Sequence, residues 1–248
     1  TFITGDKSSV RNKIMNKRVL VISDLHFPYH HKDTFPFLSK LNKVYKPDTI
    51  VMIGDEMDWH SINVSHVINP DLPSPADELL GGRSLCKQLE KIFPKMVLLE
   101  SNHGSMVLRR AMAKGMSKFF LKDYNEILEV GRGWVWKEKH IIKTDKNTVL
   151  FAHQFCKDIA KAVKETSMCC CQGHFHSVSE QKYVATDYSL NWGMSVGCLV
   201  DKKSLAMAYM KVNLAKPILS CGIITEGIPY IVPMVLNNSG SWDKNIYI

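Results

Sequence analysis

The sequence predicts an α/β fold, because its first half is typical of βαβ units and its last quarter is typical of antiparallel strands. Residues 18–175 alternate short strand-like runs with helix-like stretches, the pattern of a largely parallel sheet covered by helices. Residues 181–236 show successive strand-like runs with turn residues between them. We therefore expect both kinds of strand pairing in one large domain over residues 18–248, preceded by an extension over residues 1–17.

Apolar runs locate the strands, and capping residues locate the helices. The segment Ser74-Pro75-Ala76-Asp77 predicts a helix start, with a serine N-cap, a proline at the first helical position and an acid at the third; Pro94 ends that helix. Further helices are expected over residues 33–45, 105–122 and 157–165. The expected strands are residues 18–23, 49–53, 96–100, 148–152, 168–171, 183–186, 194–199, 205–212 and 217–225.

The composition predicts a soluble intracellular protein. No apolar run approaches the roughly 20 residues of a membrane span, and no apolar signal segment follows the N terminus, so we expect no membrane partner. Seven cysteines, three of them consecutive at 169–171, favour a reducing compartment over a disulfide framework. With 32 basic against 24 acidic side chains, the net charge of +8 slightly favours anionic partners.

The residues best suited to chemistry stand directly after five of the expected strands. In open α/β sheets, loops that leave the carboxyl ends of strands converge on one crevice, so residues distant in sequence share a site. Asp24 with His26, and His174 with His176, have i, i+2 spacing, which in extended backbone directs both side chains of a pair to one side. Gly54 and Gly173 lack a Cβ and let the chain turn beside a crowded centre. The candidate residues are Asp24, His26, Asp55, Asp58, Asn102, His103, His153, His174 and His176.

This donor set predicts two divalent metal ions. Carboxylate, imidazole and amide donors together suit Mn, Fe, Co, Ni or Zn, of which we expect manganese. Seven ligands, taken from the nine candidates above, are too many for one ion. They suit two ions that lie roughly 3.5–4 Å apart and share a carboxylate. Such a pair of ions clamps the attacking and leaving oxygens of a phosphoryl displacement.

The ordered motifs resemble those of the calcineurin-like metallophosphoesterase superfamily. Asp-x-His, Gly-Asp-x-x-Asp, Asn-His, His and Gly-His-x-His follow one another between Asp24 and His176. The resemblance implies a four-layer α/β/β/α sandwich of two mixed sheets, with the antiparallel strands in the second sheet. The segments at residues 58–61 and 101–105 further resemble stand-alone phage-encoded members, which implies the cytoplasm of a bacterium or of a phage-infected host.

The resemblance also implies a role for each ligand. In that family a hydroxide between the two ions attacks phosphorus, and the histidine after the asparagine, here His103, stabilises the phosphoryl group or protonates the leaving oxygen. Asp55 would bridge the two ions. The first ion would be held by Asp24, His26, Asp55 and His176, and the second by Asp55, Asn102, His153 and His174.

One position departs from the family pattern. Gly104 stands where the family has an Asp or Glu, which orients the histidine and raises its basicity. Asp58 or Glu100 would then have to orient His103 and raise its basicity, which makes Asp58 a second catalytic candidate. The Gly-Asp-x-x-Asp motif also lacks the Arg-Gly of protein phosphatases, whereas Gly-His-x-His is typical of the nuclease, diesterase and small-phosphatase branches.

The charge pattern bears on the substrate. Arg110, Lys114, Lys118 and Lys122 recur every four residues and would form one basic stripe on a helix over residues 105–122. Lys157, Lys161 and Lys164 would form another, and neither stripe has the interleaved aromatic residues that a single-strand platform needs.

We therefore predict a dinuclear phosphoesterase that acts on a phosphate ester of a nucleotide or nucleic acid, with monoester and diester hydrolysis both open. The alternative is a metal-holding nucleic-acid-binding or scaffold protein that has lost catalysis, for which Gly104 would be the cause.

Overall fold

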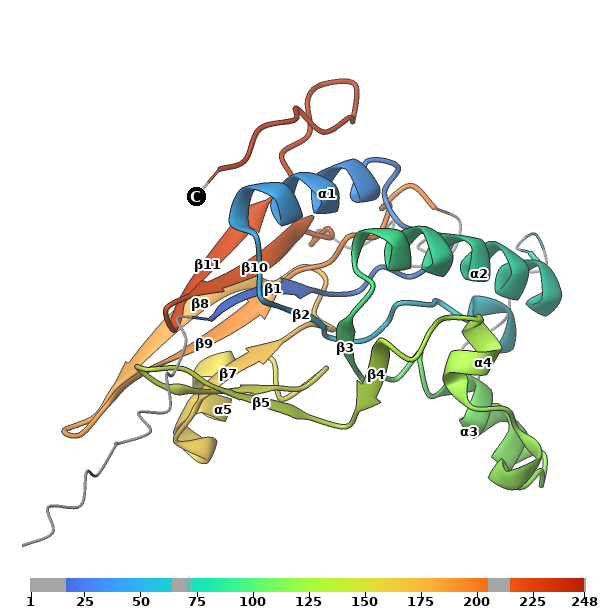
Figure 1. The fold of residues 1–248 in the computed structure, drawn as a ribbon, viewed down its shortest axis with the longest axis horizontal. Coiled ribbons are helices and arrows are strands. Elements are labelled where there is room, and N and C mark those ends of the chain that lie inside the picture. The colour runs from blue at the N-terminus through green and yellow to red at the C-terminus, as the bar shows by residue number, and fades with distance from the viewer. Residues whose placement is uncertain (1–16, 64–70, 72, 205–214, 248) are drawn as a thin grey trace, which may run out of the picture.

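Two β-sheets packed face to face, with helices on both outer faces, make up the fold (Figure 1). The computed structural model describes residues 17–63, 71, 73–204 and 215–247. The predicted α/β class and the four-layer order are confirmed. The strand expected at residues 205–212 lies outside the described residues, as does nearly all of the expected N-terminal extension.

The first sheet combines parallel and antiparallel strands. Its order is β11 (Ile228–Pro233), β10 (Ser220–Thr225), β1 (Arg18–Ile22), β2 (Thr49–Met52), β3 (Met96–Leu99) and β4 (Trp134–Lys137). Neighbours from β1 to β4 pair in parallel, whereas β10 pairs antiparallel with both β1 and β11. The parallel half therefore arises from the predicted βαβ units.

The second sheet is also mixed. Its order is β5 (His140–Lys143), β6 (Thr148–Phe151), β7 (Cys169–Gln172), β9 (Leu190–Val196) and β8 (Ser179–Ala185). β7 pairs in parallel with β6 and β9, and the two outer pairs are antiparallel. The last quarter of the chain therefore divides between the sheets, with β8 and β9 in the second and β10 and β11 in the first.

Helices cover both outer faces. α1 (Thr34–Tyr45) and α2 (Pro75–Ile92) lie on the first sheet, and α5 (Ile159–Thr166) lies on the second (Figure 1). The predicted start of α2 is confirmed, since the Ser74 side chain accepts a hydrogen bond from the Asp77 backbone N–H. The remaining helical segments are η1 (His60–Ile62), α3 (Met106–Ala113), η2 (Lys118–Phe120) and α4 (Tyr124–Leu128). No helix of the described ranges is long and apolar enough to cross a bilayer.

Alternate side chains of β1 supply two separate cores. Leu20 and Ile22 pack beneath the helices of the first sheet, whereas Val19 and Val21 pack between the sheets. A central strand that is buried on both faces needs a continuous apolar run, which is what the sequence has here. The core between the sheets fixes the edge of one sheet against the edge of the other.

The prediction of one helix over residues 105–122 is wrong. α3 ends at Ala113, and Gly115 has a φ of +77°, a left-handed conformation that interrupts a helix. A short 3₁₀ turn, η2, follows the break. The four cations at every fourth residue therefore do not form one helical stripe.

Candidate metal centre

Loops at the carboxyl ends of β1, β2, β3, β6 and β7 bring all the predicted ligands to one place. Backbone hydrogen bonds join these loops to one another. The His26 N–H donates to the Asp55 carbonyl (2.9 Å), and the Gly173 N–H donates to the His153 carbonyl (3.1 Å). The convergence inferred from the strand ends is thus present in both sheets.

The backbone of these loops is left-handed, so the extended backbone that we expected from the i, i+2 spacing is wrong. Asp24, His26, Asp55 and His174 have φ values of +50°, +49°, +53° and +66°. Each such non-glycine residue costs about 1–3 kcal/mol, and they cluster at functional sites where the surrounding structure enforces them. The ligand pairs therefore converge through tight turns.

The two site glycines are required by close packing, as predicted. At Gly54, with φ +79°, an added Cβ would lie 2.5 Å from Ser101 Cβ. At Gly173 it would overlap Ser23 Oγ and lie 2.5 Å from Asp24 Oδ2. A side chain at either position would displace a ligand loop.

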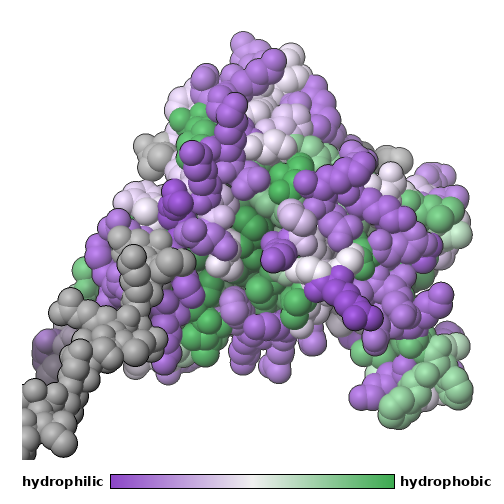
Figure 2. Space-filling view, in the orientation of Figure 1, coloured by the Kyte–Doolittle hydropathy of each residue, from purple (hydrophilic) through white to green (hydrophobic). Residues whose placement is uncertain are grey.

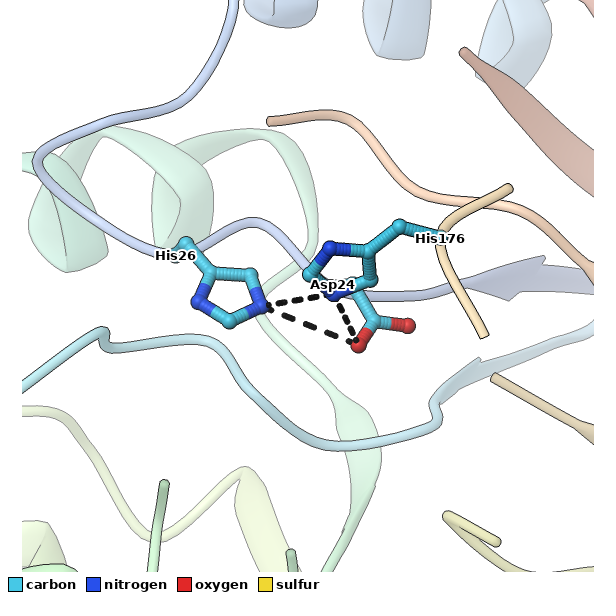
Figure 3. A group of neighbouring side chains, drawn as sticks. All are labelled: Asp24, His26 and His176. Carbon is cyan, nitrogen blue, oxygen red and sulfur yellow. Dashed lines mark hydrogen bonds and ion pairs between the residues drawn. The ribbon is translucent and has the colours of Figure 1, made fainter. Parts of the chain in front are cut away.

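A first group of donors contains Asp24, His26 and His176, whose polar atoms point toward one another (Figure 3). His176 Nε2 lies 3.2 Å from Asp24 Oδ1 and 3.1 Å from His26 Nε2, and His26 Nε2 lies 3.8 Å from Asp24 Oδ1. Asp24 and His26 are almost fully buried. The other Asp24 oxygen accepts the His174 backbone N–H at 2.9 Å.

A second group contains Asp55, His153 and His174, with Asn102 beside it. His153 Nε2 lies 3.3 Å from Asp55 Oδ2 and 2.7 Å from Asn102 Oδ1. The same Asn102 oxygen lies 3.2 Å from His174 Nδ1. The two histidines of the Gly-His-x-His motif thus face different groups.

The Asp55 carboxylate lies between the two groups. Its Oδ2 is 3.7 Å from His26 Nε2 and 3.3 Å from His153 Nε2. Its Oδ1 accepts the backbone N–H of His103 at 3.0 Å. Asp55 belongs to the group with His153 and His174 and also to a third group, with His26 and His103. Within the part of the chain that the structure describes, no other carboxylate is shared by two of these groups.

Hydrogen bonds behind the site orient two of the imidazoles. His26 Nδ1 lies 2.6 Å from Asp58 Oδ1, and His153 Nδ1 donates to the Ile53 carbonyl at 2.7 Å. Each bond uses Nδ1 and leaves Nε2 facing the donor groups, the arrangement usual for a metal-ligating histidine.

The carboxylates and histidines of the two donor groups shift one another's pKa values. Burial alone would raise the pKa of Asp24, but its hydrogen bonds to His176 and His26 outweigh burial and lower that pKa. Burial likewise opposes the charge of His153, yet the adjacent Asp55 carboxylate raises its pKa to about 9. His174 differs, because burial and the charge of His153 both lower its pKa.

His103 is oriented without an acid. Its Nδ1 donates to the backbone carbonyl of Asp58, whereas the Asp58 carboxylate is bonded to His26 and lies 3.8 Å away. Glu100 is exposed. The Asp58 carboxylate thus lies closer to His26 than to His103 and is placed to orient His26. A role for Asp58 or Glu100 in place of the missing acid stays a prediction.

Two residues that the sequence reasoning did not assign, Ser101 and Glu56, occupy the space beside Gly104. A Cβ on Gly104 would lie 2.9 Å from Ser101 Oγ and 3.5 Å from Glu56 Oε1. Ser101 Oγ accepts the backbone N–H groups of Asp55 (2.9 Å) and Gly104 (3.0 Å), so it ties the two loops together. Glu56 is fully buried, and burial raises its pKa to about 7. An aspartate at 104 would displace Ser101.

Comparison with known proteins shows a shared fold. No protein-family profile matches the chain, and no curated protein matches it in sequence. It is similar to Vps29 of Chaetomium thermophilum, with 11% identity over 93% of this chain and 94% of that one and a TM-score of 0.50. An archaeal phosphodiesterase (11% identity, 87% and 99% covered, TM-score 0.46) and the phosphoesterase YfcE of E. coli (14%, 91% and 96%, TM-score 0.42) also match.

The structural match to Vps29 agrees with the fold that the motifs predicted. At this level of identity the similarity establishes the fold. The donor chemistry is an independent observation, since buried carboxylate, imidazole and amide groups within coordinating reach of one another suit divalent metal ions.

Metal binding should release protons. With a pKa of about 9, His153 is protonated at pH 6–8, and its Nε2 proton must leave before that atom binds a metal ion. The apparent affinity of the Asp55/His153/His174 group should therefore rise about tenfold per pH unit between pH 6 and 8. Calorimetry in two buffers of different ionisation enthalpy measures the released proton. His153→Gln should reduce that release by the proton of His153, while the proton of His26, whose pKa is also raised, should still be released. An unchanged release would show that His153 carries no released proton.

The histidines of the Gly-His-x-His motif should serve different ions. His176→Ala removes a donor from the Asp24/His26 group, and His174→Ala removes one from the Asp55/His153 group. Anomalous diffraction from metal-soaked crystals should show each variant depleted at a different position. Depletion at the same position in both variants would contradict this assignment.

Proposed function

We propose that this protein is a dinuclear metal-dependent phosphoesterase that hydrolyses a phosphate ester of a nucleotide or nucleic acid. The observation that carries the proposal is the position of Asp55. Its Oδ2 lies 3.7 Å from Nε2 of His26, on the side of the first group, and 3.3 Å from Nε2 of His153, in the second group. A carboxylate so placed suits a bridge between two ions. Asp24, His26 and His176 would complete the first site, and Asn102, His153 and His174 the second.

When bound, two such ions would polarise the phosphoryl oxygens and provide a strong nucleophile near neutral pH. The protein's own residues would fix the site. The Asp58 carboxylate and the Ile53 carbonyl hold the rings of His26 and His153 through their Nδ1 atoms. We therefore assign Asp58 a positioning role.

His103 is the candidate to act on the substrate directly. Its backbone N–H is bound to Asp55, and its Nδ1 is bound to the Asp58 carbonyl. No other hydrogen bond holds Nε2 within the described residues, which leaves that nitrogen to contact a phosphoryl oxygen or the leaving group. A backbone carbonyl thus takes the orienting place of the acid that Gly104 lacks.

Metal-dependent hydrolysis tests the proposal. With Mn²⁺ added, the protein should hydrolyse nitrophenyl phosphate monoesters or bis-nitrophenyl phosphate, and chelation should abolish turnover. Asp55→Asn should lose at least one ion and nearly all turnover, because the carboxylate proposed to bridge both sites loses its charge and one of its two donor oxygens. Asp145→Asn, at an exposed position, is the matched control and should retain both ions and rate.

The outcome of that assay also decides between the proposal and the alternative of a metal-holding protein without catalysis. Two ions per chain with no turnover of either ester type would support the alternative. Normal turnover and two ions in Asp55→Asn would instead disprove the bridging assignment. Relative rates on the two ester types would settle monoester against diester hydrolysis.

Leaving-group dependence tests His103. A general acid is worth about 10²–10⁴-fold on a leaving group that needs a proton, and little on a good one. His103→Ala should therefore cost far more on a nucleoside ester than on a nitrophenyl ester. Equal losses on both would make His103 a phosphoryl-binding residue, and no loss on either would remove it from the mechanism.

A further inference from the structure

A protrusion beside the metal centre exposes apolar and basic side chains together. It comprises α3, η2 and the turn between them, which we call the α3–η2 protrusion (residues 105–122; Figure 1). Phe119 and Phe120 are 87% and 81% exposed, and Met112 is 60% exposed. In Figure 2 this lobe, at the lower right, shows hydrophobic next to hydrophilic atoms. Two adjacent, almost fully exposed phenylalanines have no role in the core.

The protrusion is basic and has no acidic side chain. Within the described residues, none of its cations forms an ion pair with a carboxylate. Lys118 Nζ lies 5.6 Å from the centre of the Phe119 ring, so one cation lies against an exposed aromatic face. The five cations are Arg109, Arg110, Lys114, Lys118 and Lys122.

A hollow of about 550 Å³ lies among α3, η2, the start of α4 and the end of β3. Phe119 and Trp136 line it together with Lys118 and Lys122, and its lining continues to Gly104, the residue after His103. That volume is within the range of small-ligand pockets. Glu100 and Asp123 also line the hollow, so its two lysines are matched by two acids there. Its aromatic walls fit a nucleobase, and the cations of α3 outside the hollow suit phosphates.

We infer that the α3–η2 protrusion binds single-stranded nucleic acid and leads it to the metal centre; this inference rests on the proposed function and specifies its substrate. Exposed aromatic side chains next to cations are the features of single-strand binding surfaces, where bases stack on rings and cations contact phosphates. The expectation that aromatic residues are missing from the basic segment is wrong, since Phe119 and Phe120 lie between Lys118 and Lys122.

A mononucleotide and a duplex fit the protrusion less well than a single strand. A mononucleotide would fill the hollow but leave Phe120 and Met112 exposed, because neither lines it. A duplex keeps its bases stacked internally and offers the phenylalanines no face. A strand uses both the hollow and the ridge beyond it.

Binding by the metal-free protein tests the inference separately from catalysis. Fluorescence anisotropy with labelled single-stranded decathymidylate in EDTA should show binding, and a duplex of equal length should bind more weakly. Phe119→Ala combined with Phe120→Ala should weaken strand binding at least tenfold. Tyr188→Ala is the matched control, since Tyr188 is 97% exposed on the β8–β9 turn and should have no effect.

Salt dependence tests the cations. For single strands, the slope of log affinity against log salt is about 0.7 per neutralised phosphate. Lys118→Ala with Lys122→Ala should flatten that slope by about 1.4. Lys91→Ala with Lys95→Ala, exposed lysines near the opposite end of β3, should leave the slope unchanged.

Three results would overturn the inference. The first is undiminished strand binding by the double phenylalanine variant. The second is thymidine monophosphate binding as tight as that of the strand. The third is sedimentation that shows a dimer lost on replacing both phenylalanines, with strand binding unchanged by that replacement. Aryl ester hydrolysis by the unmodified protein separates the two proposals. Hydrolysis without strand binding refutes only this inference. Strand binding without hydrolysis refutes the proposed function, and leaves the protrusion as a strand-binding surface that delivers no substrate.

Discussion

Burial of two carboxylates, Asp24 and Asp55, is the constraint on which the rest of the site depends. Both are almost completely removed from water, and an isolated buried carboxylate would be strongly disfavoured unless paired. Their partners are histidines that keep the pKa of Asp55 and Asp24 low, with His26 and His153 correspondingly raised in pKa. Divalent ions would take over that balancing role and release the imidazole protons, which is why metal affinity and pH are linked here.

The two sheets contribute different chemistry, so the site exists only when they are packed together. The loops after β1, β2 and β3 of the first sheet supply both carboxylates and the amide, whereas three of the four proposed imidazole ligands come from the second sheet. The apolar core between the sheets sets their separation, and its burial offsets the unfavourable φ values of the ligand loops. Loss of packing between the sheets would therefore separate the two carboxylates from three of the four imidazoles.

The sequence was informative where chemistry and strand ends coincide. Asp24, Asp55 and His153 each follow a strongly apolar strand, so their convergence could be predicted from the geometry of α/β sheets. The strands β4, β5 and β11 were missed because they are short or have partly exposed faces, which weakens the apolar pattern. The left-handed backbone of the loops could not be predicted, since nothing local requires it at Asp or His; neighbouring loops enforce it. Likewise, Phe119 and Phe120 resemble core residues in sequence, and only the fold reveals that they face outward.

The loop after β3 links the two halves of the proposed function. It carries Asn102 and His103 at the metal centre, passes through Gly104 and continues directly into α3. A Cβ at Gly104 would lie 2.9 Å from Ser101 Oγ, so a larger residue there would displace the hydroxyl that accepts the backbone N–H groups of Asp55 and Gly104. The glycine therefore does more than remove an acid from the family motif. It leaves room for Ser101 Oγ between the Asp55 loop and the start of α3, while the Asp58 carbonyl accepts a hydrogen bond from His103 Nδ1 in the place where the acid would stand.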